Sequence, residues 1–348
     1  MVCIAAFIIL ALIGLFIAII SIFKREVGKQ YLKMMKKAWS CVWKKVRLQK
    51  CETGFKEDVK NTVLSKVIVR HPKWVKPLSV IMEVLSVIIV LVAVWALLTA
   101  IKSLLALWTL GTCNVTKPAA CSLSSEVCSI DSAEPSNVFE STGRWFEEWS
   151  EIFAAIPDKF RSFNPAELNY AGVSTYDNEN EIALDILDPG CAVCLRSFLN
   201  QKQSGFFKSH NVKIVPYAIK NPNGEFKFKN SDILVRYILA TEKVKPGKAI
   251  VIIEKLFEGK NEDGVIYQTL FNNEYSKEKT VEVIEGWLRE AELCDDEIAA
   301  IRLTSVDGSV DEDIETNQNL IENQIHVKGI PTMIYDNSKH TGLFEAKN

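Results

Sequence analysis

The chain has 348 residues and a formal net charge of only −2, but its charges are unevenly distributed. Residues 24–77 carry 16 Lys+Arg against 4 Asp+Glu, whereas residues 103–348 carry 24 against 38. A basic run beside a membrane segment is usually a topology determinant that touches anionic lipid. Because Trp39, Trp43 and Trp74 in this run are typical of interfacial anchors rather than base-stacking platforms, we expect no nucleic-acid partner.

Two apolar runs predict two transmembrane helices. Residues 2–23 contain no charge and are long enough to cross a bilayer. Residues 84–101 form the second run, and their apolar character continues to Leu110. We therefore assign residues 1–23 to a first transmembrane helix and residues 78–110 to a second.

The basic loop between these helices, residues 24–77, predicts the membrane topology. It is short enough for the positive-inside rule, which keeps it in the cytoplasm. The N-terminus and the C-terminal domain are then extracytoplasmic. The first helix lacks a basic n-region and a small-residue cleavage site, so we do not interpret it as a cleaved signal peptide. The sequence predicts a two-pass protein of the cell membrane that contacts the lipid bilayer.

Six of the nine cysteines fall on the predicted outer side, where disulfides can form. Cys113, Cys121 and Cys128 cluster directly after the second helix, and two of them are expected to pair and staple this short segment. Which two cannot be read from the sequence. For Cys294 we favour a small, buried apolar role. Cys113, Cys121 and Cys128 are therefore the candidates for a structural disulfide.

Residues 111–180 are predicted to be an extracytoplasmic linker with amphipathic helices. Apolar side chains recur every three to four residues from Phe146 to Phe163. Pro157 interrupts this stripe and is expected to open a second short helix, because Pro is tolerated in the first helical turn. Glutamates beside the stripe argue against headgroup binding, so we expect it to dock on the C-terminal domain or to form an interfacial stalk.

Residues 181–348 predict a compact α/β domain of ordinary size. Its strands are expected at 181–187, 212–219, 332–336 and 342–346. One helix is expected from Cys191 to Ser209, and helix-like segments fill the long stretch between the second and third strands. Ser309 and Glu312 form a capping-box signature ahead of a helix that reaches about Ile325.

The segment DPGCAVCLRSF, residues 188–198, places a C-x-x-C motif at the start of a helix. Backbone N–H groups there stabilise a thiolate, so Cys191 is the predicted nucleophile. Cys194 is placed to attack a mixed disulfide formed at Cys191 and release the partner. Structural zinc needs four Cys or His ligands, and no second C-x-x-C or nearby His pair exists, so we expect no metal. A purely structural disulfide is disfavoured because so short a loop adds little constraint.

Two separated motifs, IALDILDPGCAVCLRSF and the distant HVKGIPTMIYD, resemble the thioredoxin-fold family. The helical insertion between them is similar to that of DsbA-like thiol–disulfide oxidoreductases, and the resemblance covers residues 181–346. It implies a cis-proline at Pro331 that faces the nucleophile. The backbone of Ile330 would pair with a bound peptide, and Thr332 follows in the same motif. The expected fold is a thioredoxin-like domain with a helical insertion, preceded by two transmembrane helices.

The resemblance also implies a buried acid on the first strand, six residues before the nucleophile, where Asp185 stands. Asp185 would accept the proton of Cys194, with a pKa raised by burial. An exposed position at the strand edge remains the alternative, because alternation alone does not say which face is buried. Two features depart from the family: the dipeptide Ala192-Val193 between the cysteines, and the lack of a closing helix after the last strand. Residues 144–163 are a candidate to cover that face of the sheet.

These features predict a membrane-anchored extracytoplasmic thiol–disulfide oxidoreductase. The outer location and the β-branched Ile330 favour an enzyme that forms disulfides in exported or surface proteins with cysteines. By resemblance, its electron acceptor would be a quinone-linked membrane partner, and no cofactor is expected within the chain. A disulfide isomerase or reductase is one alternative. A non-catalytic scaffold at the membrane is the other.

Overall fold

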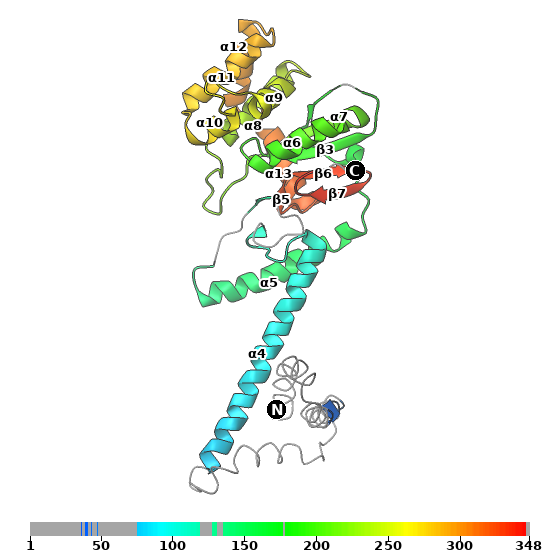
Figure 1. Cartoon of the computed structure of the whole chain (residues 1–348), viewed down its shortest axis with the longest axis vertical. Coiled ribbons are helices and arrows are strands. Elements are labelled where there is room, and N and C mark those ends of the chain that lie inside the picture. Colours follow the sequence, from blue (N-terminus) through cyan, green and yellow to red (C-terminus); the bar gives the residue numbers. More distant parts are fainter. Residues whose placement is uncertain are drawn as a thin grey trace, which may run out of the picture. The chain divides into compact units, whose positions relative to one another are not determined.

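The computed structural model describes residues 75–118, 127–130, 135–176 and 178–345, together with Lys36, Trp39, Ser40, Trp43 and Arg47. The chain divides into two compact units, Met1–Ile101 and Lys102–Asn348. The second unit carries the sheet, the cysteine motif and the helical insertion (Figure 1).

Among the described residues, one helix is long and apolar enough to cross a membrane. Helix α4 (Val75–Leu110) contains this stretch at Val87–Leu110. Many of its large apolar side chains are exposed, with Leu91 61% and Leu97 60% accessible, whereas Ala106 and Leu110 near its end are buried. The other predicted membrane segment, residues 2–23, lies outside the described residues, as does nearly all of the basic loop.

A five-stranded mixed sheet forms the centre of the second unit, in the order β2-β4-β3-β6-β7. Its strands are β2 (Val173–Ser174), β3 (Ile182–Leu187), β4 (Asn211–Pro216), β6 (Thr332–Tyr335) and β7 (Ser338–Thr341). Strands β3 and β4 are parallel, and every other pairing is antiparallel. This parallel pair, followed by an antiparallel hairpin on the other side of β3, gives a thioredoxin-like α/β fold. Strand β2 comes from the segment predicted as a linker, so the sheet begins before residue 181.

The central strand β3 positions the cysteine motif. Its residues Ala183 to Leu187 are buried on both faces, which is usual for a strand covered by helices on each side. The chain then turns into α6 (Ala192–Ser204), which Gly205 ends in a left-handed conformation, and continues as α7 (Phe206–Ser209). The single helix predicted to Ser209 is therefore two helices, because glycine at the helix C-cap adopts positive φ without a Cβ penalty.

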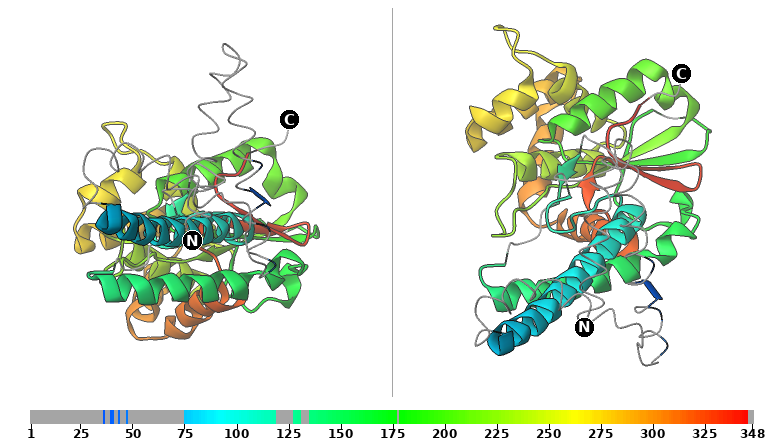
Figure 2. Two further views of the ribbon diagram at one scale, coloured as in Figure 1. Left: turned by 90° about the horizontal axis from the view of Figure 1, so that it is seen from below. Right: turned by 60° about the horizontal axis from the view of Figure 1, so that its bottom comes forward.

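The stretch between β4 and β6 is a helical insertion. Its helices are α8 (Ser231–Val244), α9 (Ile250–Glu258), α10 (Tyr267–Asn273), α11 (Lys277–Glu290), α12 (Asp295–Val306) and α13 (Asp311–Asn319). Helices α10, α11 and α12 gather on the side of the sheet away from β7 (Figures 1 and 2). The predicted capping box at Ser309 is wrong: α13 begins after Val310, whereas Cys294 and Glu297 form a capping box at α12.

The end of the domain differs from its prediction. A two-residue turn at Asp336 and Asn337, both with positive φ, joins β6 directly to β7. This turn matches the twist of an antiparallel hairpin, and it places the last strand at 338–341 rather than at 342–346. Within the described residues, no helix follows β7.

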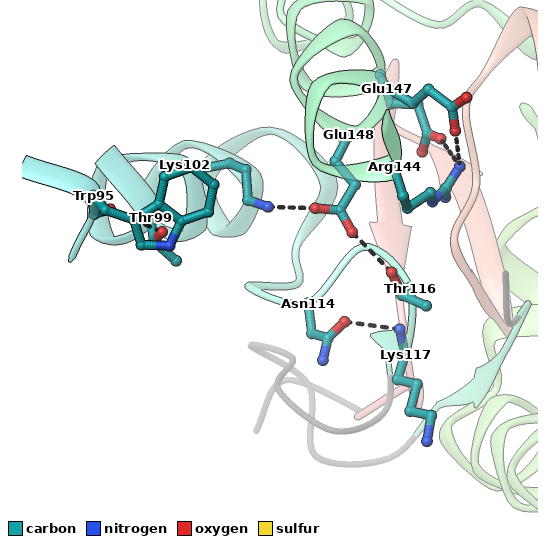
Figure 3. Close-up of polar contacts among 10 residues, drawn as sticks. Trp95, Thr99, Lys102, Asn114, Thr116, Lys117, Arg144, Glu147 and Glu148 are labelled. Atoms are coloured by element: carbon teal, nitrogen blue, oxygen red, sulfur yellow. Dashed lines mark hydrogen bonds and ion pairs between the residues drawn. The ribbon is translucent and has the colours of Figure 1, made fainter. Parts of the chain in front are cut away.

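The predicted amphipathic stripe forms α5 (Val138–Ala155), and Pro157 opens a 3-10 turn (Pro157–Lys159) as expected. The buried Ile152 and Ala155 pack with residues at and after the end of α4, whereas Phe163, at the end of the segment predicted to cover the sheet, is buried in the core of the sheet and donates its backbone N–H to the Asn337 carbonyl oxygen at 3.0 Å. Figure 3 shows Glu148 of α5 accepting from both Lys102 and Thr116. These contacts join α5 to α4 and to the segment that follows α4.

Candidate active site

Cys191 lies at the N-cap of α6, where the prediction expected a helix to start. Its backbone N–H donates to the Asp188 carbonyl oxygen at 3.0 Å, which closes a tight turn between β3 and the helix. The first turn of α6 contains no acidic residue, so the positive end of the helix dipole is not neutralised there. This position favours the thiolate form of Cys191 when its sulfur is reduced.

The carboxylate of Asp188 stabilises the turn between β3 and α6. Its Oδ1 accepts from the Gly190 N–H at 2.8 Å and from the Ser231 hydroxyl, and its Oδ2 accepts from the Ile219 N–H at 2.7 Å. The carboxyl group is fully buried. Burial raises the pKa of Asp188 to about 6, and the hydrogen bonds from Ile219, Ser231 and Gly190 lower it. Asp188 thus ties the cysteine turn to the end of β4 and to the start of α8.

Helix α10 of the insertion holds the outer side of the same turn. Gln268 donates to the carbonyl oxygens of Pro189 and Cys191 at 2.7 and 3.0 Å. Asn272, one turn later, donates to the Gly190 carbonyl oxygen at 2.8 Å. Sequence reasoning missed both amides, because an i, i+4 pair of polar residues normally indicates a solvated helix face. Their spacing on one face was the only available signal.

Asp185 and Cys194 lie buried behind the reactive turn. Asp185 is 1% exposed, so the alternative of an exposed strand-edge position is wrong. Its Oδ2 accepts from the Gln201 side chain at 2.8 Å, and burial raises its pKa to about 6. Burial also raises the pKa of the Cys194 thiol well above its usual range, a backbone hydrogen bond from Asp188 lowers it, and the charges of Asp188 and Asp185 raise it. Cys194 is therefore a protonated, weakly nucleophilic thiol at rest.

The distant motif comes to the cysteine turn, as the resemblance implied. The Ile330–Pro331 peptide bond is cis, and the Ile330 carbonyl oxygen lies 4.0 Å from the Cys191 sulfur. Thr332 is buried at the start of β6 and donates to the Gly329 carbonyl oxygen at 2.8 Å. This bond orients the backbone that faces Cys191.

The structure reassigns one of the three structural disulfide candidates. Cys128 is bonded not to Cys113 or Cys121 but to Cys191, with their Cα atoms 6.3 Å apart. Cys113 is also disulfide-bonded, and Cys121 lies outside the described residues. The sequence could not reveal the Cys128–Cys191 pairing, since 63 residues separate the two cysteines.

Two of the described cysteines are free thiols in different surroundings. Cys194 is buried, whereas Cys294 is exposed at the N-cap of α12, so its predicted burial is wrong. Among the described residues, no group of three or more His, Cys, Asp and Glu side chains is arranged to hold a metal.

The sequence matches no protein-family model and no curated protein. Solved structures similar to this chain include the thiol-disulfide exchange protein alpha-DsbA2 from Wolbachia pipientis, with 16% identity, a TM-score of 0.38, and coverage of 58% of this chain and 92% of that one. MdbA, a thiol-disulfide oxidoreductase from Corynebacterium diphtheriae, has 11% identity and a TM-score of 0.35, with coverage of 51% and 89%. A periplasmic thioredoxin-like protein from Salmonella enterica serovar Typhimurium has 18% identity and a TM-score of 0.32, with coverage of 50% and 83%.

Proposed function

We propose that this chain is a membrane-anchored thiol–disulfide oxidoreductase that forms disulfides in exported or surface proteins. One observation carries the proposal: the cysteine turn converges with the Ile330–Pro331 backbone. Cys191 stands at a helix N-cap, 4.0 Å from the Ile330 carbonyl oxygen, and Cys194 lies buried one turn behind it. A thiol so placed can exchange with a cysteine in a chain that runs along residues 329 and 330.

The proposed reaction starts from a Cys191–Cys194 disulfide. A client thiolate attacks the Cys191 sulfur, a client–Cys191 bond forms, and Cys194 leaves as a thiolate that takes up a proton. A second client thiolate then attacks the client sulfur and releases Cys191 as a thiolate. The client loses two electrons and the cysteine pair gains them. Asp185 supports proton transfer at Cys194, because burial raises its pKa to about 6, near ambient pH.

Return of the cysteine pair to the disulfide requires an electron acceptor. We propose a quinone-linked membrane protein in this role. The apolar stretch Val87–Leu110 supports an anchor in the same bilayer. The proposed orientation leaves the catalytic domain on the outer side, where disulfides persist.

Trapping experiments test the oxidoreductase function on the full chain in detergent micelles, with every variant reduced beforehand and with scrambled, disulfide-bonded ribonuclease A as the client probe, so that the Cys191 thiolate attacks a client disulfide and releases a client thiol. The Cys128→Ser/Cys194→Ala variant keeps Cys191 but lacks both internal partners, so it should accumulate a mixed disulfide with the probe. The matched Cys128→Ser/Cys191→Ala variant should accumulate none, because Cys194 is buried. Equal trapping by both variants would contradict the assignment of Cys191.

A glutathione redox titration of the Cys128→Ser variant separates oxidase from reductase. A potential near the DsbA value of ~−120 mV would support disulfide formation, whereas one near the thioredoxin value of ~−270 mV would favour a reductase. A scaffold is the second candidate, because a Cys128–Cys191 bond with Cys191 fully buried and Cys128 partly buried would suit a permanent disulfide. A Cys128–Cys191 disulfide that resists reduction in the wild type, together with a Cys128→Ser/Cys194→Ala variant that traps no client, would favour it.

Labelling in intact cells tests the proposed orientation. Because Cys294 is an exposed free thiol, a membrane-impermeant maleimide should label it rapidly. Cys41 and Cys51 of the basic loop should react only after the membrane is permeabilised. Labelling of Cys41 and Cys51, but not Cys294, in intact cells would reverse the topology and favour a cytosolic reductase. The Cys294→Ser variant controls for labelling at other outer cysteines.

A further inference from the structure

Strand β1 (Cys128–Ser129) lies antiparallel to β5 (Gly329–Ile330), directly before the cis-proline. Cys128 is opposite Ile330, and Ser129 is opposite Gly329. The Ile130 N–H donates to the Lys328 carbonyl oxygen at 3.1 Å, which extends the ladder by one residue. This segment therefore uses the backbone groups that a bound client peptide would need.

Side-chain contacts also hold residues 127–130 against β5. A Cβ atom at Gly329 would lie 3.2 Å from the Val127 Cβ, so glycine allows the two backbones to approach closely. The Lys227 ammonium group donates to the Ser129 carbonyl oxygen at 3.0 Å, and Ser129 is only 3% exposed. Residues 127–130 thus occupy a built site.

The three sulfurs at this site share one disulfide. Cys128 is bonded to Cys191, and Cys194 is a buried free thiol. A Cys194 thiolate can attack the Cys191 sulfur, so that the Cys191–Cys194 bond forms and the Cys128–Cys191 bond breaks. Cys128 leaves as a thiolate and takes up a proton equivalent to the one that Cys194 lost. No net oxidation occurs, so no external oxidant or reductant is needed.

We propose that Cys128 is a third redox-active cysteine of this site, and that residues 127–130 act as a tethered substitute for the client. Bonded to Cys191, the segment closes the edge beside the cis-proline. When Cys194 forms its disulfide with Cys191, residues 127–130 are released and the backbone edge of β5 becomes accessible to a client. This inference rests on the proposed function, in that it describes how the same site is closed and opened.

The burial of Cys194 slows its attack on the Cys128–Cys191 disulfide. A thiol exchanges through its thiolate, and burial together with two nearby carboxyl groups keeps Cys194 protonated. A tethered thiol also has an effective concentration on the order of 1 mM. A client cysteine at ~0.1 mM should therefore occupy Cys191 about ten-fold less than Cys128 does.

Disulfide mapping of the oxidised full chain in detergent tests the proposal. Free thiols are alkylated after an acid quench, and the unreduced digest is read by mass spectrometry. The wild type should contain both the Cys128–Cys191 and the Cys191–Cys194 pairs, and the two should interconvert over time. The Cys194→Ser variant should hold only the first pair, and Cys128→Ser only the second. A wild type in which Cys128 is always free, or in which the two pairs never interconvert, would overturn the proposal.

A kinetic readout mixes the oxidised protein with a ten-residue reduced peptide that has a single cysteine, at ~0.1 mM, so that the peptide thiolate attacks the Cys191 sulfur and the internal partner of Cys191 leaves as a thiolate. Its mixed disulfide with Cys191 should form about ten-fold faster in Cys128→Ser than in the wild type, while the Cys294→Ser control should match the wild type. Equal rates in Cys128→Ser and the wild type would overturn the closure of the site. If neither protein reacts while the maps are as expected, the proposed function fails and the three-sulfur exchange stands.

A second variant leaves all sulfurs in place. Lys227→Met removes the donor to Ser129 and should shift the wild-type map toward the Cys191–Cys194 pair. Lys229→Met, at a neighbouring exposed lysine, is the matched control and should leave the map unchanged. A Lys227→Met map identical to that of Lys229→Met would contradict the built site around residues 127–130.

Discussion

The Asp185→Asn variant is expected to be more stable than the wild type at pH 8, by about 2–3 kcal/mol in the free energy of unfolding, and equally stable at pH 4. Burial raises the pKa of Asp185 to about 6, whereas an unfolded aspartate titrates near 3.9. Each pKa unit corresponds to about 1.4 kcal/mol, and a two-unit difference gives this magnitude. Gln201 can still donate to the amide oxygen of an asparagine.

The sign follows from proton binding. Between pH 4 and pH 6 the folded chain binds more protons at Asp185 than the unfolded chain does. The contribution of Asp185 to the free energy of unfolding is therefore largest below pH 4. It falls as the pH rises from 4 to 6 and stays at its lowest value above pH 6. Thermal unfolding in one detergent from pH 4 to pH 8 measures the difference. Asp336→Asn, at an exposed turn, is the control, with an expected change within about 0.5 kcal/mol.

The same variant should be a slower catalyst. Asparagine cannot accept the Cys194 proton, and loss of a general base costs at least about 100-fold. We expect the rate of Cys194 attack on a Cys191–glutathione disulfide to fall by about this factor at pH 7, and to lose its inflection near pH 6. Parallel stability curves would show that the pKa of Asp185 is the same in the folded and unfolded states, and an unchanged pH–rate profile would show that Asp185 takes no part in proton transfer.

Gly190→Ala is expected to destabilise the chain by about 2–3 kcal/mol and to slow thiol exchange about 100-fold. A Cβ atom at Gly190 would lie 2.3 Å from the Cβ and 2.6 Å from the Cγ of Phe228. Neither atom is the far end of a flexible side chain, so the turn itself must shift. That shift moves Cys191 and breaks the fit of Asn272 to the Gly190 carbonyl oxygen.

Gly143→Ala provides the matched control for this variant. Gly143 lies inside α5 with nothing within 4 Å of an added Cβ atom. Alanine there should raise stability by about 0.5–1 kcal/mol, because glycine is a poor residue in a helix interior. Thermal unfolding and the glutathione exchange rate of both variants measure the contrast. Equal stability of Gly190→Ala and the wild type would show that Phe228 can move aside at little cost.

Local patterns predicted the parts of the site that lie within one element. The strand to Leu187, the helix that starts at Cys191 and the Pro157 turn follow from apolar runs, a helix-opening motif and proline geometry. The predicted capping box failed because α13 begins one residue later than Ser309 predicts, with Val310 at its N-cap, whereas Cys294, a residue type that rarely caps helices, forms the capping box of α12 with Glu297. A terminal strand was likewise misplaced, since the hairpin turn at Asp336 and Asn337 depends on positive φ at residues other than glycine.

Short-range patterns were enough to predict the apolar stretch that is long enough to cross a membrane, the C-x-x-C helix start and the proline motif, because each pattern has its own physical meaning. Three features came from the folded chain alone: the bond between Cys128 and Cys191, the hold of Gln268 and Asn272 on the reactive turn, and the links of Asp188 to the segment after β4 and to α8. These contacts join residues that are 31 or more positions apart. Their formation depends on how the insertion and the linker pack around the sheet, which no local spacing encodes.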